Sequence, residues 1–217
     1  YRTQSKVVLI VTAALIVLPA IYFFFFEFGD LPVGERILAS LFQSVTPRTA
    51  GFNTVNLTAI SDTGLYLMII LMLIGGSPGS TAGGMKTTTI TVLFSSAFSV
   101  CRKKDNAELM KRRIDDETIK TASAIFIMYI SLFLLGGMAI SAIENLPITS
   151  CLYETASAVG TVGLTLGITP TLGIASKLIL IISMFFGRVG GMTLIYAAFG
   201  ANKKQAAKLP TDTIAVG

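Results

Sequence analysis

The 217-residue sequence contains no histidine and no tryptophan, and it has only two cysteines. Without histidine, the chain cannot form a histidine-based metal site or carry out histidine acid–base catalysis. Cys101 and Cys151 lie far apart and form no C-x-x-C pair, which predicts neither a disulfide framework nor a zinc site. We expect a protein that is not an enzyme, with no catalytic residues and no cofactor of its own.

Charged residues are also scarce. They make up 13% of the chain, against about 25% in soluble domains, while 53% of the residues are hydrophobic. This composition is typical of a membrane protein. The net charge of +5 is compatible with nucleic-acid binding, but the basic residues flank apolar runs, as they do in membrane proteins. We expect a lipid bilayer and no nucleic acid as the partner.

Four apolar runs are long enough to cross a bilayer, which takes about 20 residues. They cover residues 7–26, 65–100, 119–143 and 172–199. The second run is too long for one straight crossing. Its stretch GGSPGSTAGG (75–84) holds five glycines and one proline, which break helices. The sequence therefore predicts a helix interrupted at this stretch.

Two shorter segments, 31–45 and 146–159, lie between these runs and each begins with Leu-Pro. Proline is favoured in the first turn of a helix. Each segment is too short to cross a bilayer, which favours a re-entrant half-helix. The alternative is an amphipathic helix on the membrane surface.

Lysine and arginine predict the orientation. Four crossings place 12 of the 17 basic residues on one side, which the positive-inside rule makes cytoplasmic. Both ends of the chain then lie in the cytoplasm, and the short segments enter from outside. The mixed-charge run 102–113 is expected to be a solvated cytoplasmic helix or loop. The 12 residues are Arg2, Lys6, Arg102, Lys103, Lys104, Lys111, Arg112, Arg113, Lys120, Lys203, Lys204 and Lys208.

The order of span, short helix, loop and span occurs twice, in parallel orientation. TAGF (49–52) matches TVGL (161–164), and AGGM (82–85) matches VGGM (189–192). Within the second copy, its two motifs lie closer together than the two motifs of the first copy do. The first copy therefore contains extra residues between its motifs, and we assign these to GGSPGS.

These loops have the properties of a cation path. A helix that enters from outside points its negative dipole end at the membrane centre. Irregular backbone at that depth is tolerated where it lines a water-filled path, and rings of carbonyls coordinate K⁺ in known filters. We expect K⁺ at the filter residues only, which are Thr49, Ala50, Gly51, Phe52, Thr161, Val162, Gly163 and Leu164.

Four motifs, TPRTAGFN (46–53), GGSPGSTAGGMKT (75–87), SAVGTVGL (157–164) and GRVGGMTL (187–194), resemble the Trk/Ktr/HKT potassium transporter superfamily, most closely the KtrB-type subunit. The resemblance implies an all-α membrane protein with four M1–pore-helix–M2 repeats around one pore. This chain resembles the third and fourth repeats, which form the C-terminal half of such a protein. The units would be a first repeat (1–101), a cytoplasmic linker (102–118), a second repeat (119–200) and a cytoplasmic tail (201–217).

The resemblance also implies that the interrupted helix carries an intramembrane gate. The gate residues would be Gly75, Gly76, Ser77, Pro78, Gly79, Ser80, Thr81, Ala82, Gly83, Gly84, Lys86 and Arg188. A nucleotide-binding P-loop is the weaker interpretation, because Met85 separates Gly84 from Lys86 and the flanks are apolar.

Four charged side chains need individual interpretations. Arg188 either lies at the pore near the gate or reaches the cytoplasmic interface. Lys86 either caps loop carbonyls or lines the pore. Arg48, beside the outer mouth, and Glu154 are expected to support their own filter loops by hydrogen bonds.

The function implied is K⁺ uptake across the cell membrane, with Na⁺ dependence as in many KtrB-type members. Such subunits form homodimers and bind a cytoplasmic RCK-type ring (KtrA-like), which would carry any nucleotide. Segments 102–113 and 203–217 are candidate docking surfaces. A broken-helix secondary transporter for an organic or anionic substrate is the alternative function, and a purely structural bundle is a third possibility.

Overall fold

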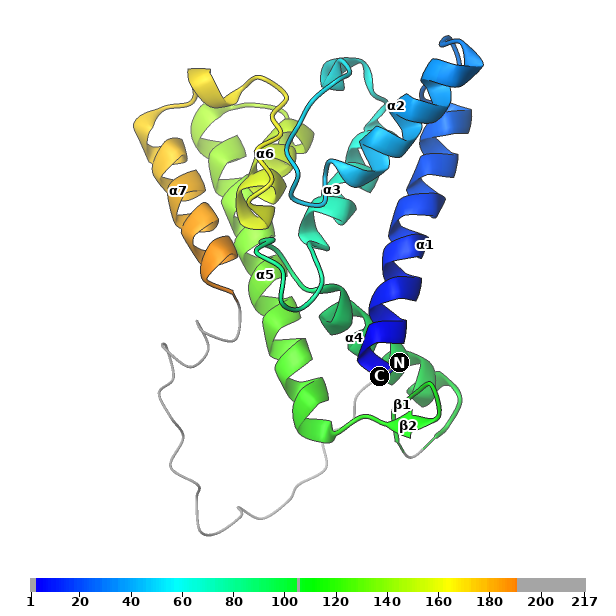
Figure 1. Cartoon of the computed structure of the whole chain (residues 1–217). Helices are drawn as coiled ribbons and strands as arrows, with labels where there is room; N and C mark the ends of the chain where they lie inside the picture. The colour runs from blue at the N-terminus through cyan, green and yellow to red at the C-terminus, as the bar shows by residue number, and fades with distance from the viewer. Residues whose placement is uncertain (1–2, 105, 191–217) are drawn as a thin grey trace.

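The computed structural model describes residues 3–104 and 106–190, and the regular structure in these residues is helical apart from one small hairpin. In chain order the helices form two groups, α1 to α4 and α5 to α7, and Figure 1 shows α3 and α4 lying between α1–α2 on one side and α5–α7 on the other. The helices are α1 (Thr3–Phe26), α2 (Val33–Val45), α3 (Asp62–Leu73), α4 (Thr87–Cys101), α5 (Asp116–Glu144), α6 (Ile148–Gly160) and α7 (Ile174–Val189).

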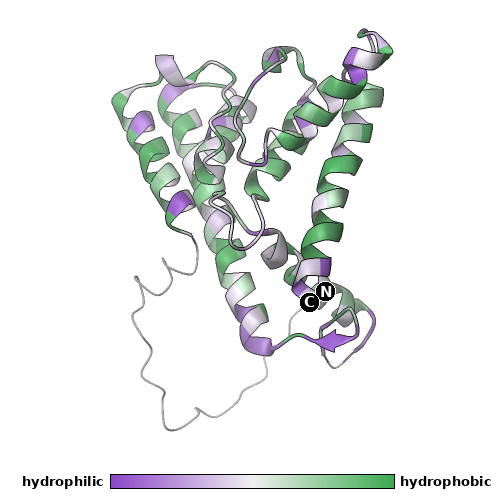
Figure 2. Cartoon of the chain, viewed as in Figure 1, coloured by the Kyte–Doolittle hydropathy of each residue, from purple (hydrophilic) through white to green (hydrophobic). Residues whose placement is uncertain are grey.

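Both groups begin with a long apolar helix. Helices α1 and α5, with 24 and 29 residues, are long and apolar enough to cross a membrane, whereas α3 and α4 are shorter apolar helices. Apolar residues cover most of α1, α5 and α7, and hydrophilic residues gather at the lower end of the molecule in the view of Figure 2. Large side chains such as Phe26 and Leu135 are exposed by 74% and 67%. An apolar surface of this extent calls for lipid or another protein surface as its neighbour.

A shorter helix of 13 residues follows the long one in each group. Pro32 and Pro147 precede the first turns of α2 and α6, and their extended backbone (ψ 145° and 132°) prevents the helix from starting earlier. Helix α2 packs on α1, whereas α6 packs on α3, α5 and α7. The second short helix is therefore the centre of the molecule, and all its residues from Tyr153 to Gly160 are buried.

The apolar run 65–100 forms two helices with no helix between residues 74 and 86. We call residues 74–86 the interhelical loop. Its first and last parts lie side by side, since Ile74 and Met85 form an isolated parallel bridge and the Met85 amide donates to the Leu73 carbonyl at 2.9 Å. Helix α3 begins at Asp62, before the apolar run, because the Ser61 hydroxyl caps the Gly64 amide at 3.1 Å.

The segment 102–113, expected as a solvated helix or loop, contains a small hairpin of β1 (Glu108–Leu109) and β2 (Arg112–Arg113). Met110 and Lys111 between these strands both have positive φ, as a tight two-residue hairpin turn requires. Alternating charge gave no sign of this turn. The predicted tail at 201–217 and the end of the predicted second repeat, 191–200, lie outside the described residues.

Close packing of α7 on α6 yields a stability prediction. A Cβ atom on Gly187 would lie 2.0 Å from the Val159 carbonyl oxygen, an overlap that only a backbone shift relieves. We expect Gly187→Ala to lower the stability of the full-length protein by about 1–3 kcal/mol, measured by thermal unfolding in detergent. The control is Gly34→Ala in α2, where no atom lies within 4 Å of the added methyl group. Equal midpoints for the two variants would contradict the prediction.

Candidate functional site

The segments that follow α2 and α6 share left-handed backbone at two matching positions. Residues 49–52 are called the first motif and residues 161–164 the second motif. Thr49 and Thr161 both have left-handed φ, at 67° and 51°, and Gly51 and Gly163 do so at 77° and 94°. Positive φ is uncommon for threonine, so its occurrence at both matching positions is a structural similarity beyond the sequence match.

Each motif is tied to the end of its own short helix. The Thr46 hydroxyl donates to the Phe52 carbonyl at 2.5 Å. In the second copy, the Gly163 amide donates to the Ser157 hydroxyl at 3.1 Å. These hydroxyl contacts hold the irregular backbone close to the carboxyl ends of the helices, where the helix dipole is negative.

The two motifs also touch one another. A Cβ atom on Gly51 would lie 2.1 Å from the Val162 carbonyl oxygen, so only glycine permits this approach. Val162 and Leu164 are buried, whereas Phe52 is 72% exposed. The Thr161 hydroxyl is buried without a hydrogen-bond partner among the described residues. The structure thus brings together the predicted filter residues of both copies.

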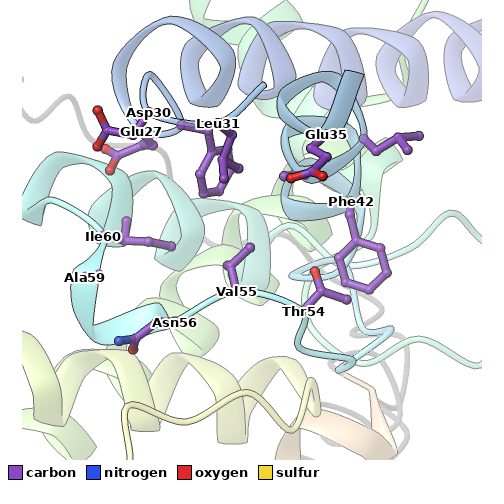
Figure 3. A pocket seen from close by; sticks show the side chains of 13 residues that line it. Glu27, Asp30, Leu31, Glu35, Phe42, Thr54, Val55, Asn56, Ala59 and Ile60 are labelled. Carbon is purple, nitrogen blue, oxygen red and sulfur yellow. The ribbon is translucent and has the colours of Figure 1, made fainter. Parts of the chain in front are cut away.

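Two cavities lie near these segments. One, of about 570 Å³, is lined by residues 161–165 together with Glu154 and Arg188. The other, of about 670 Å³, lies between the end of α1, helix α2 and residues 54–60. Figure 3 shows Glu27 and Asp30 at one end of this second cavity. Its lining includes neither motif.

The interhelical loop lies directly against the second motif. A Cβ atom on Gly83 would lie 2.2 Å from the Thr161 hydroxyl and 2.7 Å from the Gly160 carbonyl oxygen. Within the loop, Gly75 approaches the Gly83 carbonyl oxygen equally closely. In Figure 1 the loop lies below the end of α6. Small residues are therefore needed here for backbone contact, which the sequence alone did not reveal.

Both predicted gate cations, Lys86 and Arg188, bind carbonyls of this loop. Lys86 donates to the carbonyls of Ala82 at 2.7 Å and Ser80 at 3.3 Å. Arg188 donates to the Thr81 carbonyl at 2.6 Å, although it belongs to α7. Of the two roles considered for Lys86, these bonds correspond to capping of the loop. The loop follows helix α3 and no strand, which is not the setting of a P-loop.

Arg48 was expected to support its own filter loop at the outer mouth. Its guanidinium instead reaches the Gly75 carbonyl, at 3.4 Å from Nη2. A turn over residues 46–50 continues from α2, and the Arg48 side chain extends from this turn to the start of the interhelical loop. No sequence signal linked Arg48 to a residue 27 positions away.

Glu154 was expected to support its filter loop, and it contacts the residues that follow the second motif. Its carboxylate accepts bonds from the Thr165 hydroxyl at 2.6 Å, the Leu166 amide at 2.9 Å and the Thr169 hydroxyl at 2.6 Å. Its side chain is buried. Three donors around one buried carboxylate hold residues 165–169 in place. No group of three acidic or cysteine residues suited to a metal ion occurs in the described ranges.

Known proteins are similar to this chain in sequence and in fold. The profile of the TrkH family, described as a cation transport protein, matches residues 2–205. This chain belongs to the TrkH family. Helices α1 and α5 and the apolar surface agree with the membrane setting of such transporters.

Two proteins with related sequences have names that describe ion uptake. The potassium/sodium uptake protein NtpJ of Enterococcus hirae is 39% identical, over 99% of this chain and 50% of that protein. The Ktr system potassium uptake protein B of Vibrio alginolyticus is 34% identical, over 99% of this chain and 48% of that protein. The chain therefore spans about half the length of these relatives.

A solved structure shares the fold of this TrkH-family chain. The crystal structure of the potassium transporter TrkH from Vibrio parahaemolyticus superposes with a TM-score of 0.72 over 86% of this chain and 43% of that one, at 23% identity. The likeness extends over most of the described helices.

The Glu154 contacts yield the second prediction. We expect Glu154→Ala to loosen residues 163–169, because a hydrogen bond to a charged group stabilises by about 1.5–3 kcal/mol. Hydrogen exchange at the Leu166 amide in the full-length protein should rise at least about tenfold, since each 1.4 kcal/mol of local opening is a factor of ten. The control is Glu117→Ala at the start of α5, for which no such bond to this loop exists among the described residues. Unchanged exchange at Leu166 would contradict the prediction.

Proposed function

We propose that the full-length protein transports K⁺ across the cell membrane and that this chain supplies half of its pore. The carrying observation is the shared left-handed geometry of Thr49 and Thr161, and of Gly51 and Gly163, in two motifs that touch. K⁺ would be coordinated at residues 49–52 and 161–164. The names of the relatives, which include potassium and sodium uptake, support this proposal.

Helices α1, α2 and α3–α4 would form one M1–pore-helix–M2 repeat, and helices α5, α6 and α7 would form a second. The same order of helices in both groups supports it. The repeats would cover 1–101 and 119–200, with 102–118 as the linker between them. Because this chain spans about half of its relatives, two further motifs from the rest of the protein would complete the ring.

Electrostatics favour a cation over the anionic substrate of the alternative transporter. Both motifs follow the carboxyl end of a 13-residue helix, where the macrodipole contributes about half a negative charge. Half-helices that bind an anion would present their amino ends instead. The start of each short helix, at Val33 and Ile148, lies away from the contact between the motifs.

We further propose that the interhelical loop is the gate. It lies against Thr161 and Gly160, and Arg188 and Lys86 bind its carbonyls. A loop in this position would close the path below the motifs, and the charge of Arg188 would oppose a resident K⁺. Its displacement would open the path.

The remaining assignments follow from the family. The protein would be a homodimer of the full-length subunit in the cell membrane, with the basic hairpin side in the cytoplasm. A cytoplasmic RCK-type ring would bind there and would carry the nucleotide. Na⁺ would activate uptake, as the sodium in one relative's name suggests.

The filter assignment gives the third prediction. Gly163→Ser forces a side chain onto a residue with φ of 94°, which costs about 1–2 kcal/mol and should reorient its carbonyls. We expect the K⁺ over Na⁺ preference of uptake by the full-length protein to fall by about tenfold, since about 1.4 kcal/mol, the middle of this range, is a factor of ten. Gly167→Ser is the matched control, with φ of 93° and open space but outside the motif. Equal loss in both variants would contradict the filter assignment.

The gate assignment gives the fourth prediction. Deleting residues 76–80 should raise the K⁺ uptake rate of the full-length protein in uptake-deficient bacteria, because the obstruction is removed. Arg188→Gln should raise it to a smaller extent by weakening the bond to Thr81. The control, Lys177→Gln, lies on the same helix and loses a bond to the Pro170 carbonyl far from the loop. An unchanged or slower rate in the deletion would reject the loop as the gate.

A further inference from the structure

Three cationic side chains from three parts of the chain donate to carbonyls of the interhelical loop. Lys86 belongs to the loop itself and Arg188 to α7, and both bind its middle. Arg48 is the third and binds its beginning, at Gly75. Only Arg48 comes from the segment that leads into a motif, since Thr49 follows it directly.

The backbone at Arg48 has little freedom. Its amide donates to the Val45 carbonyl at 3.0 Å, and the Ala50 and Gly51 amides both donate to the Thr46 carbonyl at 3.2 Å. Arg48 is therefore part of a closed turn that includes the first half of the first motif. A force on its side chain acts on the turn that positions Thr49 and Gly51.

The contact with Gly75 is weaker than the other two. Its 3.4 Å exceeds the usual ~2.9–3.0 Å of an N–H···O bond. The Nε of the same guanidinium is buried without a partner among the described residues. A bond of this kind holds the loop but breaks at lower cost than those of Lys86 and Arg188.

The two ends of the loop are thus attached to different motifs. Gly75 is held by Arg48 beside the first motif, and Gly83 packs against Thr161 of the second. The loop cannot leave the site while both contacts persist. Release of Gly75 frees the part that contains Gly76 to Ser80, which is the part most exposed.

We propose that Arg48 is a positioning residue that couples the loop to the first motif: its bond to Gly75 holds the loop closed and breaks when the loop opens. This inference rests on the proposed gate. The position of the loop then affects the turn that carries Thr49 and Gly51, so that gating and ion preference change together.

The test uses the full-length protein with Arg48→Gln and Arg48→Lys, each with residues 76–80 present or deleted. In the intact loop, Arg48→Gln should speed K⁺ uptake about fivefold, because this long bond is expected to contribute no more than an ordinary uncharged hydrogen bond. Arg48→Lys should give a smaller increase, because an ammonium group also donates to a carbonyl. The matched control is Arg36→Gln, which loses a bond to the Phe24 carbonyl at 2.5 Å, away from the loop.

In the deleted background, Arg48→Gln should add nothing, because no loop remains to be held. An equal effect in both backgrounds would mean that Arg48 acts on the first motif independently of the loop, which would overturn the proposed coupling. Unchanged uptake with the intact loop would overturn it as well. If the deletion itself does not speed uptake, the proposed gate fails first, whatever Arg48 does.

A second measurement is independent of transport. Ala82 is half-buried in the loop, and Ala82→Cys can be labelled by a thiol reagent in a Cys101→Ser background, which removes the exposed native cysteine. Arg48→Gln should speed labelling several-fold, in proportion to the population of released loop. Labelling at the same rate as in the protein with Arg48 would overturn the proposal even where uptake is lost through misfolding.

Discussion

Close contact between backbone segments, irregular and helical, is the constraint on which the rest of the structure depends. Gly51 meets Val162, Gly83 meets Thr161, and Gly187 meets Val159, each at a distance that excludes a Cβ atom. In an apolar environment such backbone must find its partners within the protein. Glycines at these points allow two motifs, a loop and a helix end to share one small volume. The surrounding helices, with α6 at the centre, hold this arrangement in place.

Lysine and arginine side chains supply hydrogen-bond donors to the carbonyls of the interhelical loop. The interhelical loop has few helical bonds for its carbonyls, and lysine and arginine donate to four of them, at Gly75, Ser80, Thr81 and Ala82. A charge inside a membrane is costly unless it is paired or hydrated. Each partner therefore reduces the other's cost, since the carbonyls stabilise the charge and the charge satisfies the carbonyls. Such bonds also make the loop position sensitive to single side chains.

The sequence predicted much of the helical fold but little of the packing. The length of the apolar runs was sufficient to predict α1 and α5, and the Leu-Pro pairs predicted where α2 and α6 begin. Glycine and proline located the interruption at 74–86. The hairpin at 108–113 was missed because its turn residues, Met110 and Lys111, carry no turn signal. The contacts of Arg48 and Gly83 were unpredictable, since they join residues distant in sequence through their three-dimensional arrangement.

The two copies contribute different surfaces to the small volume that the motifs share. The first contributes the interhelical loop between α3 and α4, and the second contributes the last turn of α7, which ends at Val189. A single loop of this length already touches the second motif through Gly83 and the turn of the first through Arg48. Gly187 lets α7 approach α6 closely, and Arg188 on the last turn of α7 then reaches the Thr81 carbonyl. One copy thus contributes the loop, and the other contributes the helix surface and the arginine against which it is held.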